Sequence, residues 1–372
     1  MNNTLTSPGN RQAGIFVAVA SFLSIGVVAP GCSEADPKDF GPPPESASPD
    51  PTAEMGSAPP GTPLYAEVFS VTDAAVLDGD WFVLDGRANQ VHRISPEGEP
   101  VRSFGREGSG PGEFRRANAI VAHGDSIVVV GGGMVHVFGS GGEHIADRRV
   151  QPAPSFDCFA PTMRTTGAVS VETGLLLQVE CFGLDGSLAV HIVAEGADGF
   201  VRSLAHREGK RGQFDFGGTL TVVAGHPRGF LFGSAWESCL DLYSLSGRRL
   251  DAICHDWLEP VDLPPEVARE FEGMIADARR QGIRVRLPET LPAIVGVSAM
   301  AGGRLVYRRL VSADLDMDTF QLVTRDETGQ AVVLPVPPAP VLFQDGRSVL
   351  AAWEELEGTR IYTRTLNSLD GS

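Results

Sequence analysis

The sequence predicts an all-β protein: a six-bladed β-propeller with four antiparallel strands in each blade and one inserted helix. Two observations predict this fold. From residue 64 onward, apolar residues alternate with polar ones or form runs of five to eight, and Gly, Asp, Asn or Ser separates the runs. These strand-like runs recur in groups of three or four, about 50 residues apart, which is the spacing of propeller blades. A β-sandwich and a pair of separate β-domains are the alternatives.

The composition fits a chain with many tight turns. The 372 residues include 44 glycines and 27 prolines, a combined share well above the usual ~12%. Hydrophobic residues make up 42% of the chain, which is enough to form a core. These values argue against a helical bundle and against a disordered chain.

The charge balance excludes a nucleic-acid partner. The chain carries 47 acidic and 30 basic residues, for a formal net charge of −17, and its lysines are Lys38 and Lys210 alone. Such a negative field repels a phosphate backbone, and no basic helix or ladder of basic and aromatic residues offsets it locally. We therefore expect no nucleic acid among the partners.

A glycine-rich connector supports the propeller prediction. The first predicted blade contains the strands WFVLD (81–85), QVHRIS (90–95) and PVRSFG (100–105). The connector that follows, FGREGSGPGEF (Phe104–Phe114), recurs one hundred residues later as HREGKRGQF (His206–Phe214). Together with Asp85 and Asn89, this connector resembles the blades of NHL-type six-bladed propellers. The resemblance implies six blades.

The N-terminus has the pattern of an export signal. Sixteen uncharged residues, Ala13–Val28, follow Arg11, a run too short for a transmembrane helix and suited to a signal-peptide core. The run ends at Ala29-Pro30-Gly31-Cys32, which resembles the lipobox of bacterial lipoproteins. This resemblance implies cleavage after residue 31, lipid on Cys32 and, with Ser33 next to it, the outer membrane. An ordinary secretory signal with a chance cysteine is the alternative.

The chain therefore divides into three predicted regions. Residues 1–31 form the signal peptide, residues 32–63 a proline-rich tether that cannot bury a core, and residues 64–372 the propeller. We expect an exported protein, in the periplasm or at the cell surface, that contacts the membrane through its lipid anchor only. The leader, tether and connector together resemble bacterial propeller lipoproteins of unassigned role.

A helical segment interrupts the strand pattern between the fourth and fifth predicted blades. Within Pro264–Gly282, apolar residues recur at helical spacing, prolines begin the segment and glycine ends it. We therefore place a helical insertion at about residues 258–290. Its apolar side packs on the propeller in one interpretation and docks a partner in the other.

Four further cysteines predict two disulfides in an exported chain. The segments CLDLYSL and RRLDAIC flank Ser246-Gly247, and a hairpin centred on this turn places Cys239 opposite Cys254. Cys158 and Cys181 then pair by elimination. No cysteine spacing fits zinc, and four buried thiols are the alternative to disulfides.

The predicted binding site consists of arginines on one face. In a blade of four antiparallel strands, the second-to-third loop and the connection to the next blade emerge at the same end. The longest loops therefore share a face with the helical insertion. The candidate residues there are Arg87, Arg106, Arg115, Arg116 and Arg211. Guanidinium groups bind anionic or polar acceptors, which suits a protein, peptide or glycan of the cell envelope. Solvated connector loops are the alternative interpretation.

No catalytic or metal-binding motif stands out. The eight histidines are scattered without an HExxH or GxSxG motif, and His92, His136 and His191 fall at equivalent positions in presumed third strands. The predicted inner strands, which are apolar or small, are Ala74–Leu77, Ala119–Val121, Ala168–Val171, Thr219–Val223 and Val295–Ala299. We therefore assign no catalytic residue, no metal ligand and no cofactor.

The sequence thus favours a lipid-anchored, extracytoplasmic binding module. The alternative is a metal-dependent lyase or lactone hydrolase with its site, and a divalent metal ion, in the propeller channel, because six-bladed relatives include such enzymes. A purely structural component of the envelope is a third interpretation.

Overall fold

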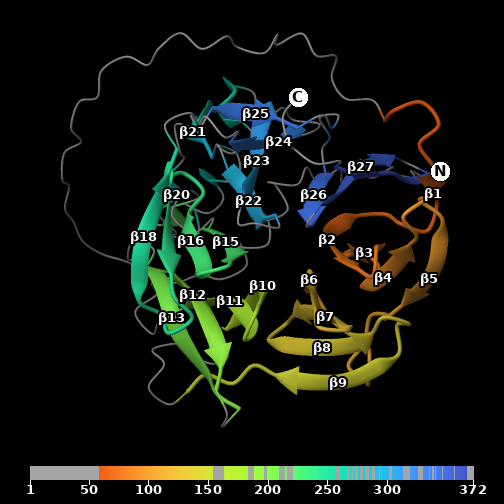
Figure 1. Cartoon of the computed structure of the whole chain (residues 1–372), viewed down its shortest axis with the longest axis horizontal. Helices are drawn as coiled ribbons and strands as arrows, with labels where there is room; N and C mark the ends of the chain where they lie inside the picture. The colour runs from red at the N-terminus through yellow and green to blue at the C-terminus, as the bar shows by residue number, and fades with distance from the viewer. Residues whose placement is uncertain are drawn as a thin grey trace, which may run out of the picture.

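The computed structural model describes residues 58–366 apart from several gaps. The gaps are 154–162, 183–187, 197–198, 209–213, 216–220, 256–257, 259, 266–267, 270–271, 273–274, 277–279, 281–284, 287–289, 293, 301–303, 313–318, 326–329, 335, 337–338, 340, 346 and 356. The described chain is almost entirely β-structure, and its strands form a ring of six sheets that Figure 1 shows end-on. The prediction of a six-bladed β-propeller is confirmed.

Each blade is an antiparallel sheet of four strands. Blade 1 comprises β2 (Val71–Leu77), β3 (Asp80–Asp85), β4 (Gln90–Ile94) and β5 (Pro100–Phe104). Blade 2 comprises β6 (Ala117–His123), β7 (Ser126–Gly131), β8 (Met134–Gly139) and β9 (His144–Arg149). Blade 3 comprises β10 (Arg164–Val171), β11 (Gly174–Phe182), β12 (Leu188–Glu195) and β13 (Val201–Glu208). Blade 4 comprises β15 (Thr221–His226), β16 (Gly229–Ser234), β17 (Cys239–Tyr243) and β18 (Arg249–Cys254). Blade 5 comprises β22 (Ile294–Ala299), β23 (Leu305–Ser312), β24 (Thr319–Arg325) and β25 (Ala331–Val333). Blade 6 comprises β26 (Val341–Asp345), β27 (Ser348–Glu355), β28 (Gly358–Thr365) and β1 (Leu64–Tyr65).

The ring closes through the N-terminal end of the propeller. β1 pairs with β28 and forms the outer strand of blade 6, whose other strands come from the C-terminal end of the chain. Side chains of β28 reinforce this closure. Arg360 Nη1 donates a hydrogen bond of 3.0 Å to the carbonyl of Thr62, and Thr359 Oγ1 donates one of 2.8 Å to the carbonyl of Val68. Residues from the two ends of the propeller therefore share one sheet.

The first strand of each blade is the innermost. β2, β6, β10, β15, β22 and β26 each contact the first strands of the neighbouring blades and together form the wall of a central channel. Five of them coincide with predicted inner segments. β26 is not among the predicted inner strands, because its short sequence VLFQD directly follows a proline-rich stretch.

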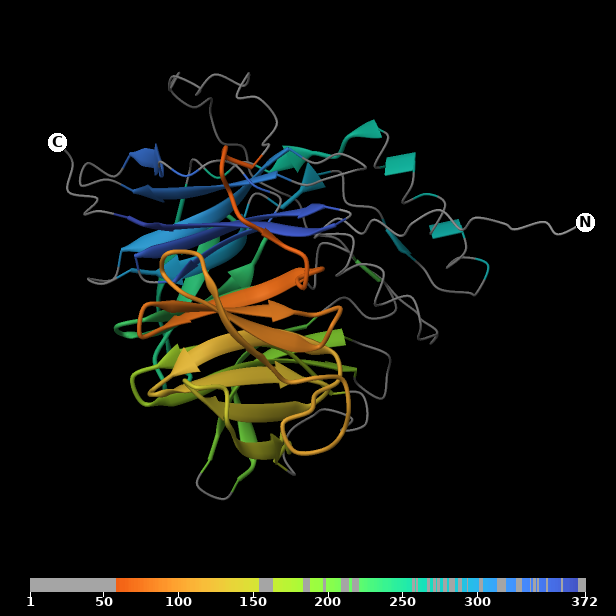
Figure 2. The same cartoon turned by 90° about the vertical axis from the view of Figure 1, so that its right-hand side faces the viewer.

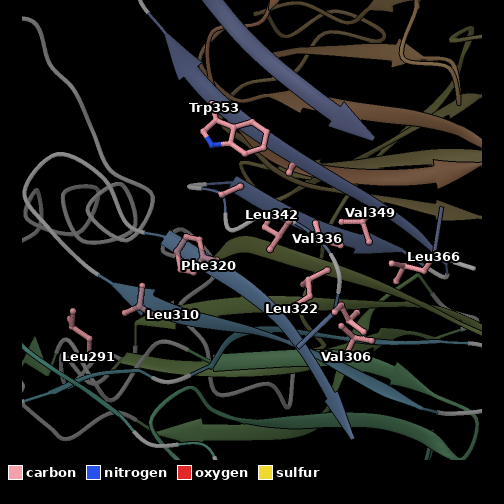
Figure 3. Packing of buried hydrophobic residues seen from close by; sticks show 13 residues of the cluster. Leu291, Val306, Leu310, Phe320, Leu322, Val336, Leu342, Val349, Trp353 and Leu366 are labelled. Atoms are coloured by element: carbon pink, nitrogen blue, oxygen red, sulfur yellow. The ribbon is translucent and has the colours of Figure 1, made fainter. Parts of the chain in front are cut away.

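The blades pack face to face through alternating residues of their strands. Figure 3 shows this packing between blades 5 and 6, where Val306, Leu322 and Phe320 lie against Leu342 and other apolar residues of blade 6. Leu342 is fully buried, and the other three are at most 6% exposed. The hydrophobic core is therefore spread over the seams between blades, which leaves the channel wall free to carry polar groups.

Asp85 and Asn89, which precede the glycine-rich connector in the first blade, have structural roles. Asp85 is fully buried, and its Oδ1 accepts hydrogen bonds of 2.9 Å from the backbone N–H groups of Arg87 and Ala88. Asn89 adopts a positive φ of 50°, and its Oδ1 accepts a hydrogen bond of 3.3 Å from the N–H of Ala117, the first residue of blade 2. These contacts shape the β3–β4 turn and attach it to the next blade.

Between β18 and β22 the chain leaves the ring. The described residues there include β19 (Val261–Asp262), β20 (Val285–Arg286) and β21 (Thr290–Leu291). β19 pairs with β21, and β20 pairs in parallel with β14 (Phe214–Asp215). The described residues between 265 and 280 are helical, as predicted, and Ile275 among them is only 3% exposed. Figure 2, a view from the side, shows these teal segments projecting beyond one face of the ring.

The predicted pairing of Cys239 with Cys254 is confirmed. The two residues lie opposite each other in β17 and β18, with their Cα atoms 4.0 Å apart, and they form a disulfide. Cys181 is buried and disulfide-bonded, and Cys158, its predicted partner, lies outside the described residues.

The predicted signal peptide and nearly all of the predicted tether, including Cys32, also lie outside the described residues. Within the part of the chain that is described, no helix combines the length and the apolar character needed to cross a membrane.

Candidate functional site

The six inner strands enclose a cavity of about 960 Å³. Every inner strand contributes to its wall, and Gln178, Val306, Arg308 and Leu322 reach it from second and third strands. This volume lies in the range of small-molecule pockets, roughly 300–1,000 Å³. The central channel is therefore the candidate functional site.

The wall of the channel is chemically divided. Below the mouth, blades 2 to 4 contribute apolar and uncharged side chains, among them Val121, Val169 and Val223. Blades 5, 6 and 1 contribute three charged side chains, which are Arg308, Asp345 and Asp73. We call this part of the wall the charged side of the channel and the opposite part the neutral side. Below its mouth, the cavity therefore presents charged side chains to a ligand on one side only.

Arg308 reaches the channel from the second strand of blade 5. It faces Gly296 across β22 and β23, just after a β-bulge in β22, and a Cβ at Gly296 would lie 3.3 Å from Arg308 Nε. Arg308 Nη1 donates a hydrogen bond of 2.9 Å to the carbonyl of Leu342, and Nη2 donates one of 3.1 Å to the carbonyl of Val295. The guanidinium group thus joins blades 5 and 6 at the channel wall.

Two aromatic rings surround the same guanidinium group. The Arg308 Cζ atom lies 5.6 Å from the centroid of Phe320 and 5.2 Å from the centroid of Phe343, which is within cation–π distance. Burial lowers the pKa of Arg308, and the negative charge of Asp73 opposes this effect. Arg308 therefore supplies a partly compensated positive charge to the wall.

Asp73 follows a β-bulge at the start of β2. Its Oδ1 accepts a hydrogen bond of 2.9 Å from the N–H of Ala74, and its Oδ2 accepts one of 2.9 Å from the N–H of Ile120 in blade 2. Burial raises the pKa of Asp73 from 3.8 to about 6, and the nearby Asp345 adds to the rise. The two backbone donors and Arg308 act in the opposite direction, so burial is the dominant effect.

Asp345 ends β26 and joins the last blade to the first. Its Oδ2 accepts a hydrogen bond of 2.8 Å from the N–H of Val76 in β2. Burial raises the pKa of Asp345, and the hydrogen bond from Val76 lowers it. Asp73 and Asp345 are therefore two interacting carboxyl groups of one wall, each tied to a neighbouring blade through a backbone N–H.

The cavity reaches the surface at the face that carries the first-to-second turns of the blades. The exposed residues Glu172, Pro227 and Arg228, which lie in such turns, line the cavity as well. His226 lies beside them, and burial, followed by the charge of Arg228, lowers its pKa. This mouth is on the face opposite the insertion, because first-to-second turns and blade connections emerge at opposite ends of antiparallel strands.

A further buried carboxyl group, outside the channel, lies in the seam between blades 3 and 4. Leu176 packs with Phe230 and Phe232 of blade 4. Glu180 lies four residues further along β11, on the same face of the strand, so it faces the same seam. Glu180 is 7% exposed, and its Oε2 has no hydrogen-bond partner among the described residues. Burial raises its pKa from 4.5 to about 7, against the opposing charge of Arg164. Glu180 is therefore a buried group that titrates near neutrality.

The structure places four of the five predicted site arginines on the face with the insertion. Arg87 lies in the β3–β4 turn, and Arg106, Arg115 and Arg116 lie in the β5–β6 connector; all four are exposed. Arg106 is paired with Glu113, with Nη2 to Oε1 at 2.6 Å. The other three form no ion pair with described residues. Arg211 lies outside the described residues.

The third-strand histidines occupy equivalent positions, as predicted. His92, His136 and His191 lie in β4, β8 and β12, and the Nδ1 atom of each is hydrogen-bonded to a residue of the fourth strand. The partners are Ser103, Asp147 and Ser203 at 2.7–3.0 Å. Among the described residues, no group of three or more His, Cys, Asp or Glu side chains is arranged to hold a metal ion.

The charged side of the channel was not predicted from the sequence. Asp73 stands one residue before a predicted inner segment, Asp345 ends the unpredicted inner strand, and Arg308 lies in a second strand. The sequence contains a signal for Asp73, because an acidic residue stands out at the start of an inner strand whose other residues are apolar or small. The sequence contains no such signal for Arg308, because this side chain reaches the channel only through the bulge beside Gly296.

No family model matches this chain, and no curated protein matches it. Solved structures match it at low identity. A luciferin-regenerating enzyme is 11% identical with a TM-score of 0.46, covering 82% of this chain and 95% of that chain. Regucalcin of Agrobacterium tumefaciens, a calcium-binding protein, is 11% identical with a TM-score of 0.43, covering 77% and 82%. A protein of unknown function from Bacteroides thetaiotaomicron is 12% identical with a TM-score of 0.46, covering 80% and 70%. These values are too low to carry an argument about function.

Proposed function

We propose that the protein is a lipid-anchored, extracytoplasmic binding module whose ligand site is the central channel of its propeller. The observation that carries this proposal is the cavity of about 960 Å³, which is lined by all six blades and, below its mouth, has charged side chains on one side only. A small molecule, or the end of a peptide or glycan, fits a cavity of this size. Charged and uncharged walls on opposite sides would fix the orientation of such a ligand.

The location rests on the sequence of the N-terminus. The apolar run before Cys32, the lipobox-like residues around it and the proline-rich segment after it support export and lipid anchoring. The disulfide between Cys239 and Cys254 supports an oxidising compartment. The glycine-rich connector supports an NHL-type propeller as the module that the tether carries.

A second binding surface remains a proposal for the face with the insertion. Arg87, Arg115 and Arg116 are exposed there and form no ion pair with described residues, so their guanidinium groups can bind acceptors of a protein, peptide or glycan. Arg106 is less suited to this role because Glu113 already occupies it.

The enzyme alternative finds less support in the described residues. A metal-dependent lyase or lactone hydrolase needs a set of ligands for its ion. The acids and the histidine that line the cavity are Asp73, Glu172, His226 and Asp345, and among the described residues they do not form a group of three or more arranged to hold an ion. The residues of the wall fit the binding of an organic ligand better.

Blocking the channel tests the proposal. Ala122→Trp introduces a large side chain into the cavity wall, and Ala331→Trp makes the same change on the exposed strand β25 as a control. The full chain and both variants are screened by thermal unfolding against a library of small polar metabolites. We expect ligands that raise the melting temperature of the wild type and of Ala331→Trp but not that of Ala122→Trp. Ligands that stabilise all three proteins equally, or a library without any ligand, would contradict a site in the channel.

A further inference from the structure

The charged side of the channel offers its ligand more hydrogen-bond acceptors than donors. Asp345 lies in the cavity wall, and its Oδ2 accepts a hydrogen bond from the N–H of Val76. No described residue donates a hydrogen bond to its Oδ1. Each carboxylate oxygen of Asp73 accepts a single backbone N–H and can accept another hydrogen bond. A ligand that donates hydrogen bonds therefore meets unfilled acceptors here.

Arg308 is less available than the two carboxylates. Two of its N–H groups are used by the carbonyls of Leu342 and Val295, and its Nε is buried without a partner, out of reach of a ligand. The rings of Phe320 and Phe343 lie near its guanidinium group. Arg308 therefore holds the wall together and leaves little surface for an anionic ligand.

The charge balance of the cavity wall also favours a ligand that carries a positive charge. Its wall contains three acidic side chains, Asp73, Glu172 and Asp345, against two basic ones, Arg228 and Arg308. The whole chain carries a formal charge of −17, so the surrounding field also favours cations. A ligand with one positive charge would balance the charged groups of the wall.

The ligand is more than a bare metal ion. A calcium ion takes roughly six to eight oxygen ligands, and the described residues contain no cluster that provides them. The cavity of about 960 Å³ exceeds the volume of an ion, and valines such as Val121 and Val223 line its neutral side. An organic cation with an apolar part would contact both sides of the channel.

We propose that the channel binds a small organic ammonium ion. The ammonium group donates hydrogen bonds to Asp345 and Asp73, the apolar part lies against the neutral side, and the ligand enters through the mouth at Glu172 and Arg228. This proposal rests on the proposed function of the channel, and it names the chemical class of the ligand.

Three probes of similar size separate the charge of the ligand from its shape. Butylammonium, butanol and butyrate each contain four carbon atoms and differ in the charge of the polar end, and ligand-observed NMR detects the weak binding expected of such small molecules. With the full chain at pH 8, we expect butylammonium to bind at least tenfold more tightly than butanol and butyrate to bind least. Tighter binding of butanol or butyrate would overturn the ammonium proposal and would still agree with a site in the channel.

One variant tests the residue that carries the proposal. Asp345→Asn keeps an oxygen for the N–H of Val76 and removes the charge, whereas Asp251→Asn removes an exposed charge outside the cavity as a matched control. We expect Asp345→Asn to weaken butylammonium binding at least tenfold and Asp251→Asn to leave it unchanged. Equal affinity in both variants would overturn the assignment.

The probe comparison needs no variant, so the proposal stays testable if Asp345→Asn fails to fold. Absence of binding by all three probes would overturn the ammonium proposal alone. The metabolite screen with Ala122→Trp then decides separately whether the channel is a ligand site.

Discussion

The Oδ2 atom of Asp85 accepts a hydrogen bond of 2.7 Å from the backbone N–H of Phe69. Phe69 lies between the closing strand β1 and the first strand of blade 1, so this bond attaches the linking segment to the end of β3. The same carboxylate accepts the N–H groups of Arg87 and Ala88 through its other oxygen. One buried side chain thus satisfies three backbone donors at the junction between the last blade and the first.

Replacement of Asp85 by alanine should destabilise the propeller by about 4 kcal/mol, because three backbone donors would lose a charged acceptor. Asp85→Asn keeps one acceptor oxygen and should cost less. Urea unfolding of the wild type and both variants measures the difference, with Asp251→Ala on the exposed side of β18 as the control. A loss below about 0.5 kcal/mol for Asp85→Ala would show that the junction does not depend on this side chain.

Loss of the disulfide between Cys239 and Cys254 should lower the unfolding free energy by about 3 kcal/mol. The bond closes a loop with a sequence separation of 15, and a loop of this size restricts the unfolded chain by about that amount. The double variant Cys239→Ser/Cys254→Ser is compared with the wild type by urea unfolding without reductant. If reductant lowers the stability of the double variant as much as that of the wild type, a different bond is responsible.

Glu180 should make the fold less stable as the pH rises. Its pKa is about 7 in the folded state and close to 4.5 in the unfolded chain, so between these values the folded state holds a proton that the unfolded state releases. The unfolding free energy therefore falls as the pH rises through this window. Glu180→Gln cannot ionise and should be more stable than the wild type at pH 8 by up to about 3 kcal/mol, with little difference at pH 4.

Asp73, with a pKa of about 6, contributes in the same direction and over a lower range of pH. Glu180→Gln should therefore keep part of the pH dependence. Urea unfolding at pH 4, 6 and 8 gives the comparison, and parallel curves for the wild type and Glu180→Gln would argue against a buried proton on Glu180.

The double variant Arg115→Ala/Arg116→Ala should lose binding on the face with the insertion and keep its stability. Both side chains are exposed and form no ion pair with described residues, so the unfolding free energy should change by less than about 0.5 kcal/mol. Crosslinking in intact cells compares the partners of the wild type and the variant. The same partners at the same yield would rule out these arginines as the contact site.

Chelators should leave the melting temperature of the protein unchanged. Among the described residues, no cluster of three metal-ligating side chains exists, so we expect no resident ion whose binding stabilises the native state. Metal analysis of the purified chain and thermal unfolding with and without chelator provide the test. A stoichiometric ion and a chelator-sensitive melting temperature would favour the enzyme alternative.

The sequence was sufficient for the fold because each blade repeats a pattern of local signals. Alternation in segments such as Gln90–Ile94 and turns such as Ser246-Gly247 depend on neighbouring residues, and the opposition of Cys239 and Cys254 follows from one hairpin. The inserted helix was visible for the same reason, since its apolar spacing and its flanking prolines are local.

The chemistry of the channel depends on contacts between distant segments. Asp73 meets the N–H of Ile120, and Asp345 meets that of Val76, across the seams between blades. Arg308 reaches the wall through a bulge in the neighbouring strand. None of these contacts produces a local sequence pattern, so the channel wall was predicted to be apolar. The exposed arginines were easier to predict, because long polar connectors can be recognised from the sequence alone.

The closing strand also determines where mechanical load enters the molecule. A pull on the chain before Leu64 is borne first by the pairing of β1 with β28 and by the bond between Arg360 and the carbonyl of Thr62. β1 is the outermost strand of blade 6, and two further strands separate it from β26 at the channel wall. Tension applied to the chain before Leu64 therefore acts on the rim of the ring, two strands away from the inner strand β26 at the channel wall.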